Sequence, residues 1–162
     1  MLPATAAQTP LPLDALRAKA LVLLARREHS RATLRKRLLP LAESAGALEA
    51  LLDDLSAHQQ LSDARYAHSR VRARGRRYGD SRLAQELRQD GLAEEAITAA
   101  LAEGEEERLR CQGVWERKFA ALPGTVEERA RQQRFLRNRG FSAPVIRQVL
   151  HGLIEEDETG YA

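Results

Sequence analysis

The chain of 162 residues is poor in the residues that build disulfide frameworks and β-sheets. Its single cysteine, Cys111, cannot form an internal disulfide, and no cysteine or histidine stands near it at a metal-ligand spacing. Aromatic residues make up 4% of the chain and β-branched residues are scarce, whereas Ala, Leu, Arg and Glu dominate. Because the abundant residues favour helices and the scarce ones favour strands, the composition predicts an all-α fold. The single cysteine is typical of a protein in a reducing compartment.

Long hydrophobic runs are missing as well. The apolar run at residues 20–25 is far shorter than the roughly 20 residues that a bilayer span requires, and basic residues flank it closely. We therefore expect no signal peptide, no membrane anchor and a cytoplasmic location.

Catalytic and metal-binding motifs are absent from the sequence. It contains no phosphate loop, no dinucleotide-binding glycine pattern, no Gly-x-Ser-x-Gly and no His-Glu-x-x-His. Four histidines lie far apart, and none has a second ligand at a zinc spacing: His29, His58, His68 and His151. We interpret them as solvated or helix-end residues, and we expect no enzyme activity, no metal and no cofactor.

What the sequence does contain is a repeat. Residues 83–101 and 132–150 carry the same order of leucines, a glycine and an apolar segment, offset by 49 positions. The same offset relates Leu34 and Leu38 to the first of these segments. Arrays of small helical units bury their core between neighbours and leave a long surface free for binding. The repeat therefore favours a binding protein over an enzyme.

Two glycines hold equivalent positions in the repeats, Gly91 and Gly140. If each follows a helix in the left-handed C′ position, apolar residues stand at the spacing of a Schellman ending: Leu87 with Leu92, and Leu136 with Phe141. Glycine adopts this conformation at low cost. We interpret both glycines as structural turns that contact no partner.

Helical periodicity divides the chain into three tandem three-helix repeats. The predicted organisation is a disordered leader at residues 1–14, repeats at 15–58, 59–103 and 104–154, and an acidic flexible tail at 155–162. The first repeat fits least well, because the connection from Pro40 to Gly46 is longer than its counterparts.

Polar residues before the apolar periods predict where helices begin. Ser30 is the predicted N-cap of the second helix, and Ser62 or Asp63 caps the opening helix of the second repeat. Leu109 is placed in the apolar stripe of a helix spanning roughly residues 105–121. The remaining expected caps are the capping-box pair Thr125 and Glu128, and Ser142.

The net charge of +3 is distributed unevenly. Residues 15–39 hold eight basic residues against one acidic, and residues 65–88 hold eight arginines against two acidic residues. Arginine outnumbers lysine by 23 to 3, which suits bidentate contacts with phosphate or carboxylate but could also reflect codon bias in a GC-rich genome. The candidate contact residues are Arg26, Arg27, Arg31, Arg35, Arg70, Arg72, Arg74, Arg76 and Arg77, with Arg137 and Arg139 as weaker candidates.

Acidic blocks restrict what could bind this surface. Residues 90–107 contain seven acidic residues and no basic one, so a long polyanion could meet only part of the chain. Glu94 and Glu95 open the helix after Gly91, where a DNA-reading helix would carry Arg, Asn or Gln. Sequence-specific DNA recognition is therefore disfavoured.

The motifs taken in order resemble the RecX family, the bacterial regulators of the RecA recombinase. The resemblance covers residues 15–153. It rests on ARREHS at 25–30, LSDARYA at 61–67, the segment 74–79, LRQDGL at 87–92 and FLRNRGF at 135–141. The chain departs from the family pattern at Ser62, where many relatives carry an acidic residue. The family resemblance implies an elongated curved array of three-helix repeats.

The resemblance also implies a function. A RecX-like protein would bind the RecA filament on single-stranded DNA in the bacterial cytoplasm and limit filament extension, ATP hydrolysis, strand exchange and coprotease activity. We expect a monomer that has at most weak direct contact with DNA. Two alternatives stay open: a non-sequence-specific nucleic-acid-binding module, disfavoured by the few aromatics available for stacking, and a helical scaffold for another acidic protein.

Overall fold

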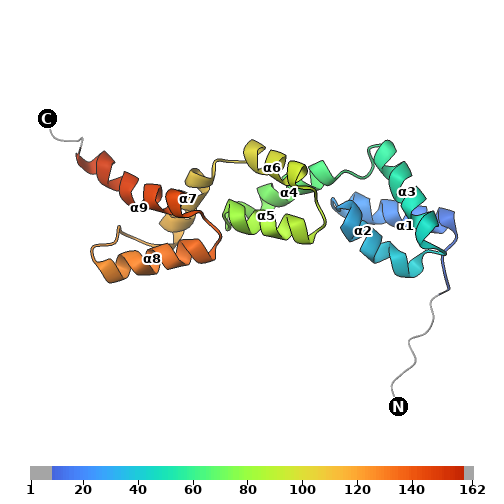
Figure 1. Cartoon of the computed structure of the whole chain (residues 1–162), viewed down its shortest axis with the longest axis horizontal. Helices are drawn as coiled ribbons and strands as arrows, with labels where there is room; N and C mark the ends of the chain where they lie inside the picture. Colours follow the sequence, from blue (N-terminus) through green and yellow to red (C-terminus); the bar gives the residue numbers. More distant parts are fainter. Residues whose placement is uncertain (1–8, 159–162) are drawn as a thin grey trace, which may run out of the picture. The chain divides into compact units, whose positions relative to one another are not determined.

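The computed structural model describes residues 9–158, with side chains described as far as residue 151 (Figure 1). Within these residues it contains nine α-helices and no β-strand, which confirms the all-α prediction. The helices are α1 (Leu13–Arg26), α2 (Arg31–Leu38), α3 (Ala45–Ala57), α4 (Asp63–Arg74), α5 (Asp80–Gln89), α6 (Glu94–Glu103), α7 (Glu107–Lys118), α8 (Val126–Asn138) and α9 (Ala143–Glu158).

The helices follow one another as three sets of three, which confirms the prediction of three tandem three-helix repeats. The limits of each repeat remain predictions. Residues 1–8 of the predicted leader lie outside the described residues, and α1 already begins at Leu13. The backbone of α9 is helical to Glu158, whereas the side chains of the predicted acidic tail and all of residues 159–162 are not described.

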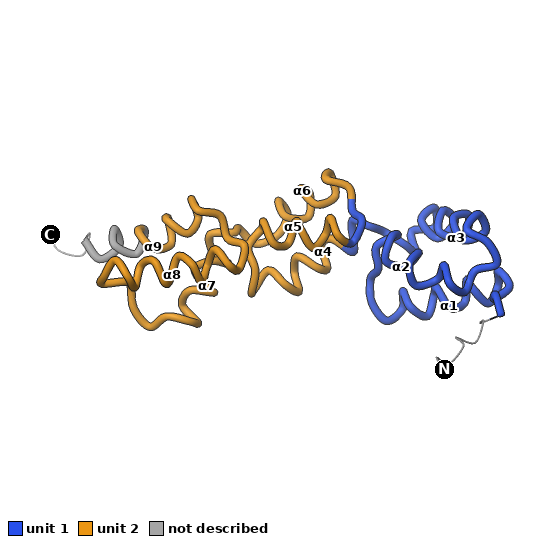
Figure 2. Tube along the Cα trace, turned by 60° about the horizontal axis from the view of Figure 1, so that its bottom comes forward, with its two compact units in different colours: residues 1–66, 90–92 blue, residues 67–89, 93–162 orange. Residues whose placement is uncertain are grey.

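Two compact units divide the chain (Figure 2). The first contains the residues up to Tyr66 together with Asp90–Leu92, and the second contains Ala67–Gln89 and the chain from Ala93 onward. No helix of the described part is long and apolar enough to cross a membrane. The core of the first unit consists almost entirely of leucines: Leu16, Ala20, Leu34, Leu38, Leu48, Leu51, Leu52, Leu55 and Leu61.

Serine side chains set the starts of α2 and α3 in the first unit. The Ser30 hydroxyl accepts from the Thr33 amide at 3.0 Å, which confirms the predicted cap. Ser44 accepts from the amide of Ala47 at 3.1 Å, so α3 begins at Ala45. The connection between α2 and α3, residues 39–44, is longer than its counterparts at 90–93 and 139–142, as expected. It ends before Gly46, because Ser44 starts the next helix, and residues 39–41 within it form a 3₁₀ turn.

The segment 90–92 packs onto the start of α2 within the first unit. The Ser30 hydroxyl donates to the Asp90 carbonyl at 2.7 Å, and the Tyr66 hydroxyl donates to the Asp90 carboxylate at 2.6 Å. Gly91 has φ +81°, and a Cβ atom there would lie 2.5 Å from Cβ of Ala32. Glycine is thus required twice at this position, by its backbone conformation and by a neighbouring helix.

A second hydrophobic cluster lies in the C-terminal part of the second unit. It comprises Cys111, Val114, Trp115, Leu136, Phe141, Ile146, Val149 and Leu150. The Trp115 indole donates to the side-chain oxygen of buried Gln132 at 2.7 Å. Leu109 does not join this cluster and is 44% exposed, so its predicted place in the core is wrong. Arg110 of α7 faces inward instead. The helix, Glu107–Lys118, is also shorter than the expected span of residues 105–121.

Arg110 ties α4 to α7 through backbone carbonyls. It is 5% exposed and donates to the carbonyl oxygens of Glu105 at 2.9 Å, Gly75 at 3.3 Å and Tyr78 at 2.7 Å. It also pairs with the Asp80 carboxylate. Burial raises the pKa of Asp80, and the Arg110 charge opposes that shift. A buried guanidinium with this many acceptors is a structural residue.

Two acidic side chains play matching roles at the first turns of α4 and α7. In the first unit, an Asp63 oxygen accepts from the Arg31 amide at 2.7 Å. In the second unit, Glu107 accepts from the Asp80 amide at 3.0 Å. Each acid therefore caps the middle helix of the repeat before it. The α4 helix itself is capped by Ser62, whose hydroxyl accepts from the Arg65 amide at 3.2 Å.

The remaining predicted caps fall at the ends of α8 and α9. Thr125 accepts from the Glu128 amide at 3.1 Å, as expected, but the Glu128 carboxylate accepts from Gly124 and not from Thr125. Ser142 donates its hydroxyl to Glu107 at 3.1 Å. Ser142 therefore links the start of α9 to α7. The sequence had indicated only an N-cap at this position.

Candidate partner-binding surfaces

Carboxylates on the neighbouring α3 helix hold two candidate arginines of the first unit. Arg31 lies 2.8 Å from Glu49 and 2.7 Å from Asp53, and Arg35 pairs with the other oxygen of Glu49. The hydrogen bond to Glu49 raises the pKa of Arg31, and the two arginines together lower the pKa of Glu49. The charges of Arg31 and Arg35 are therefore partly neutralised within the unit.

Two further candidates converge on Glu86 in the second unit. Arg74 lies 2.7 Å from its carboxylate and Arg70 lies 3.5 Å away. The hydrogen bond to Glu86 raises the pKa of Arg74, whose guanidinium also lies 4.6 Å from the ring centre of Tyr78. Arg74 consequently helps to pack α4 against α5 and is a poor choice for a surface contact.

The other candidates outside the two pockets described below carry no ion pair within the described chain. In the first unit these are Arg26 and Arg27, at the end of α1, and both are exposed. In the second unit Arg137 is exposed in the last turn of α8. Such side chains can meet an anion without first leaving a carboxylate.

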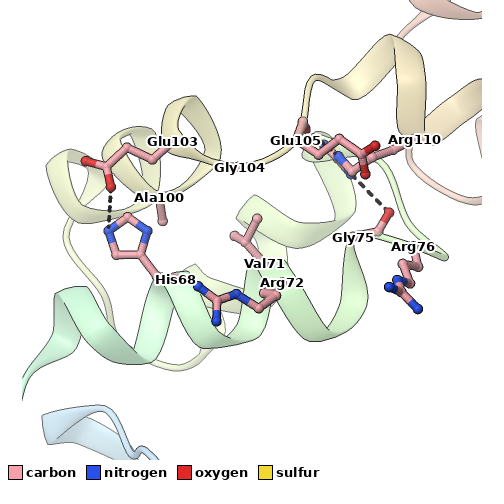
Figure 3. A pocket seen from close by; sticks show the side chains of 10 residues that line it. All are labelled: His68, Val71, Arg72, Gly75, Arg76, Ala100, Glu103, Gly104, Glu105 and Arg110. Atoms are coloured by element: carbon pink, nitrogen blue, oxygen red, sulfur yellow. Dashed lines mark hydrogen bonds and ion pairs between the residues drawn. The ribbon is translucent and has the colours of Figure 1, made fainter.

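Arg72 lines a pocket of mixed charge beside α4 and α6, which we call the mixed-charge pocket (Figure 3). Its volume is about 290 Å³. His68 and Glu103 approach each other to 3.4 Å on one side, while Arg110 reaches the Gly75 carbonyl on the other. Because acidic and basic groups line this pocket together, it has no strong preference for an anion.

In a different pocket of the second unit, all the charged side chains of the lining are positive. We call it the cationic pocket, and its volume is about 410 Å³. Its lining contains no carboxylate, and its cations make no ion pair in the described structure. The lining residues are Arg76, Arg77, Tyr78, Val114, Arg117, Lys118, Phe135 and Arg139.

The cationic pocket brings together three candidate arginines from two segments that are far apart in the sequence. Arg76 and Arg77 come from the turn after α4, and Arg139 comes from the end of α8. Sequence reasoning missed Arg117 and Lys118, which complete the charge from α7. One signal was available in the sequence: both stand in the last turn of a helix, where basic side chains are favoured by the helix dipole.

The side chains most often used for metal binding or nucleophilic attack can be placed individually within the described residues. No group of three or more His, Cys, Asp or Glu side chains there could hold a metal ion. Burial raises the pKa of the Cys111 thiol to about 12, so the thiolate needed for nucleophilic attack is not populated near neutral pH. The fold and its surface together define a helical-repeat protein with positive charge available for a partner.

Comparison with known proteins identifies the family. A model described as the second three-helix domain of RecX matches residues 62–101, and one for the third three-helix domain matches residues 105–150. Curated relatives named regulatory protein RecX include one from Chromobacterium violaceum, 44% identical over 88% of this chain and 93% of its own. One from Ralstonia pickettii is 43% identical over 93% of this chain and 97% of its own. The chain belongs to the RecX family of regulatory proteins.

Solved structures agree on the fold. The crystal structure of RecX from Lactobacillus salivarius matches 88% of this chain and 97% of its own with a TM-score of 0.78 at 17% identity. Another, of a regulatory protein RecX, matches 89% of this chain and 73% of its own with a TM-score of 0.72 at 22% identity. At such low identity these likenesses concern the fold, and the regulatory role follows from the closer relatives.

Proposed function

We propose that this protein regulates RecA by binding the RecA filament on single-stranded DNA. Binding would limit filament extension and with it ATP hydrolysis, strand exchange and coprotease activity, and so modulate recombination, DNA repair and the SOS response. The protein would act in the bacterial cytoplasm as a monomer and without chemistry of its own. The observation that carries the proposal is membership of a family of regulatory proteins named RecX.

The surface charges support a binding role and refine which arginines to consider. Four of the candidates, Arg31, Arg35, Arg70 and Arg74, are engaged by carboxylates of their own units. The contacts with the filament would then fall to the candidates without a carboxylate partner. These are Arg26, Arg27, Arg72, Arg76, Arg77, Arg137 and Arg139.

Direct binding to nucleic acid is the second candidate function, because the same unpaired arginines could contact phosphates. Fluorescence anisotropy with labelled single-stranded DNA, in the presence and absence of RecA, separates the two. A filament regulator should bind tightly only when RecA coats the DNA. Tight binding to bare DNA that weakens steeply with added salt would instead assign the protein to the nucleic-acid-binding class.

A further inference from the structure

The cationic pocket gathers several cations without any counter-charge. Two other arginine pairs each share a carboxylate: Arg31 and Arg35 pair with Glu49, and Arg70 and Arg74 pair with Glu86. In this pocket five cations, supplied by residues 76, 77, 117, 118 and 139, face one open volume without an acidic side chain in its lining. Like charges gathered at this density repel one another, and an anion entering the pocket would relieve that repulsion.

Two cations of the pocket, Arg117 and Arg139, are held in place by contacts within the second unit. The Arg117 guanidinium donates to the Arg76 carbonyl, and the Arg139 guanidinium donates to the Arg77 carbonyl at 3.5 Å. Arg139 also lies 5.0 Å from the ring centre of Phe135. These contacts use only part of the N–H groups of each guanidinium, and the rest remain free to donate to a ligand.

Aromatic rings line the pocket but offer little surface to a nucleic-acid base. Guanidinium groups already lie over the Tyr78 ring, that of Arg82 at 4.3 Å and that of Arg74 at 4.6 Å. The Phe135 and Phe119 rings pack in a T-shaped arrangement with their centroids 5.4 Å apart, and the Arg139 guanidinium lies over Phe135. Single-strand binding proteins rely on open ring faces for stacking, and these rings serve instead to position cations.

The surroundings of the pocket limit the length of an anion. Arg76 lines both the cationic pocket and the mixed-charge pocket, where Glu103 and Glu105 carry the opposite charge (Figure 3). A nucleic-acid backbone that continued past Arg76 would therefore meet two carboxylates. A short acidic segment of a protein can end before them.

We infer that the cationic pocket binds a short acidic peptide segment. The inference rests on the proposed function for the identity of the protein that supplies the segment. Carboxylates would accept charge-assisted hydrogen bonds from Arg76, Arg77, Arg117 and Arg139, and Lys118 would add a further charge. Backbone and ring contacts fix the guanidinium groups of Arg117 and Arg139 before the ligand arrives, which reduces the entropic cost of binding.

The test uses the full-length protein and a fluorescein-labelled peptide of alternating Asp and Glu. The test variant is Arg77→Gln with Lys118→Gln, since neither side chain makes a hydrogen bond or ion pair in the described structure. The control is Arg134→Gln with Arg147→Gln, which removes the same charge from exposed positions outside the pocket. Circular dichroism checks that both variants keep their helices.

We expect the test variant to weaken peptide binding by about tenfold or more in fluorescence anisotropy, and the control to bind like the unaltered protein. Equal binding by the test variant and the unaltered protein would overturn the inference. So would an oligothymidylate of equal charge that displaces the peptide from the pocket at lower concentration, because it would mark the site as a phosphate site. RecA is absent from this experiment, so its failure leaves the proposed regulation of RecA to be judged separately.

Discussion

Gly79 and Gly140 approach so closely that a Cβ atom on Gly79 would lie 2.4 Å from the carbonyl carbon of Gly140. The Gly79 amide donates to the Arg139 carbonyl at 2.8 Å, and the Ser81 amide donates to the Gly140 carbonyl at 3.2 Å. The glycine turn after α8 is thus docked on the start of α5. Gly91 is packed in the same way against Ala32 of α2, so the glycine turns join successive repeats as well as ending helices.

Replacement of Gly140 by alanine should destabilise the protein. The residue has φ +87°, and a Cβ atom would lie 2.5 Å from Cβ and 2.8 Å from the backbone nitrogen of Arg82. We expect a loss of about 1–3 kcal/mol in the free energy of unfolding, measured by urea denaturation.

Gly46 provides the matched control for this substitution. It lies inside α3, and a Cβ atom there would meet nothing within 4 Å. Gly46→Ala should therefore stabilise the protein, by roughly 0.5–1 kcal/mol. If Gly140→Ala behaved like Gly46→Ala, the docked turn would not contribute to stability.

Arg110→Met should destabilise the second unit, because it removes the donor from three backbone carbonyls and from Asp80. Buried acceptors left without partners cost about 1–3 kcal/mol each when water cannot reach them. We expect a lower midpoint of thermal unfolding by circular dichroism. Arg108→Met is the control, because the Arg108 side chain is partly exposed and its ion pair is a long 4.0 Å contact to Glu106. This variant should leave the midpoint nearly unchanged.

Mild acid should weaken the fold through His29. This side chain is 3% exposed, and burial, followed by the charge of Arg27, lowers its pKa below the ordinary value of 6.5. The unfolded chain then binds a proton at pH values where the folded chain does not. The stability associated with neutral His29 is therefore full above pH 6.5 and is lost as the pH falls from 6.5 through the folded pKa.

The slope should not exceed about 1.4 kcal/mol per pH unit for this single group. Urea denaturation between pH 7.5 and pH 5, in about one-unit steps, measures it. A His29→Gln variant should lose this part of the pH dependence even if it is less stable throughout. An unchanged slope in that variant would show that another group is responsible.

Cys111 should be unreactive in the folded protein. It is fully buried, and burial raises the pKa of its thiol to about 12. A thiol-specific chromogenic reagent at neutral pH should label it only after denaturant is added. Rapid labelling without denaturant would mean that the core around Trp115 opens readily.

The core could be predicted from the sequence wherever its leucines follow one helical period. Leu34, Leu38, Leu83 and Leu87 are all buried, and Leu136 and Phe141 form the expected Schellman ending, with the Phe141 amide donating to the Leu136 carbonyl at 3.3 Å. The prediction that Leu109 is buried was wrong because periodicity alone does not show which face of α7 turns inward. A buried Arg110 with four acceptors decides that face, and three of those acceptors, on Gly75, Tyr78 and Asp80, lie 30 to 35 residues earlier in the chain.

The candidate surface was less predictable than the core. Arginine runs mark where positive charge lies, but the pairing of Arg74 with Glu86 or of Arg31 with Glu49 depends on how helices pack. The cationic pocket likewise brings Arg77 to Arg139, which lies 62 residues further along the chain. Only tertiary structure separates neutralised arginines from free ones.

The central claim is that unpaired arginines of this chain bind the RecA filament and restrain it. The most direct measurement is the inhibition of RecA ATP hydrolysis on single-stranded DNA by Arg72→Glu, Arg76→Glu and Arg77→Glu combined, which leaves paired Arg74 in place. We predict that the unaltered protein and a control with Arg134→Glu and Arg147→Glu inhibit ATP hydrolysis equally. About a tenfold higher concentration of the triple variant should be needed for the same inhibition. Undiminished inhibition by a folded triple variant, or no inhibition by the unaltered protein, would contradict the account.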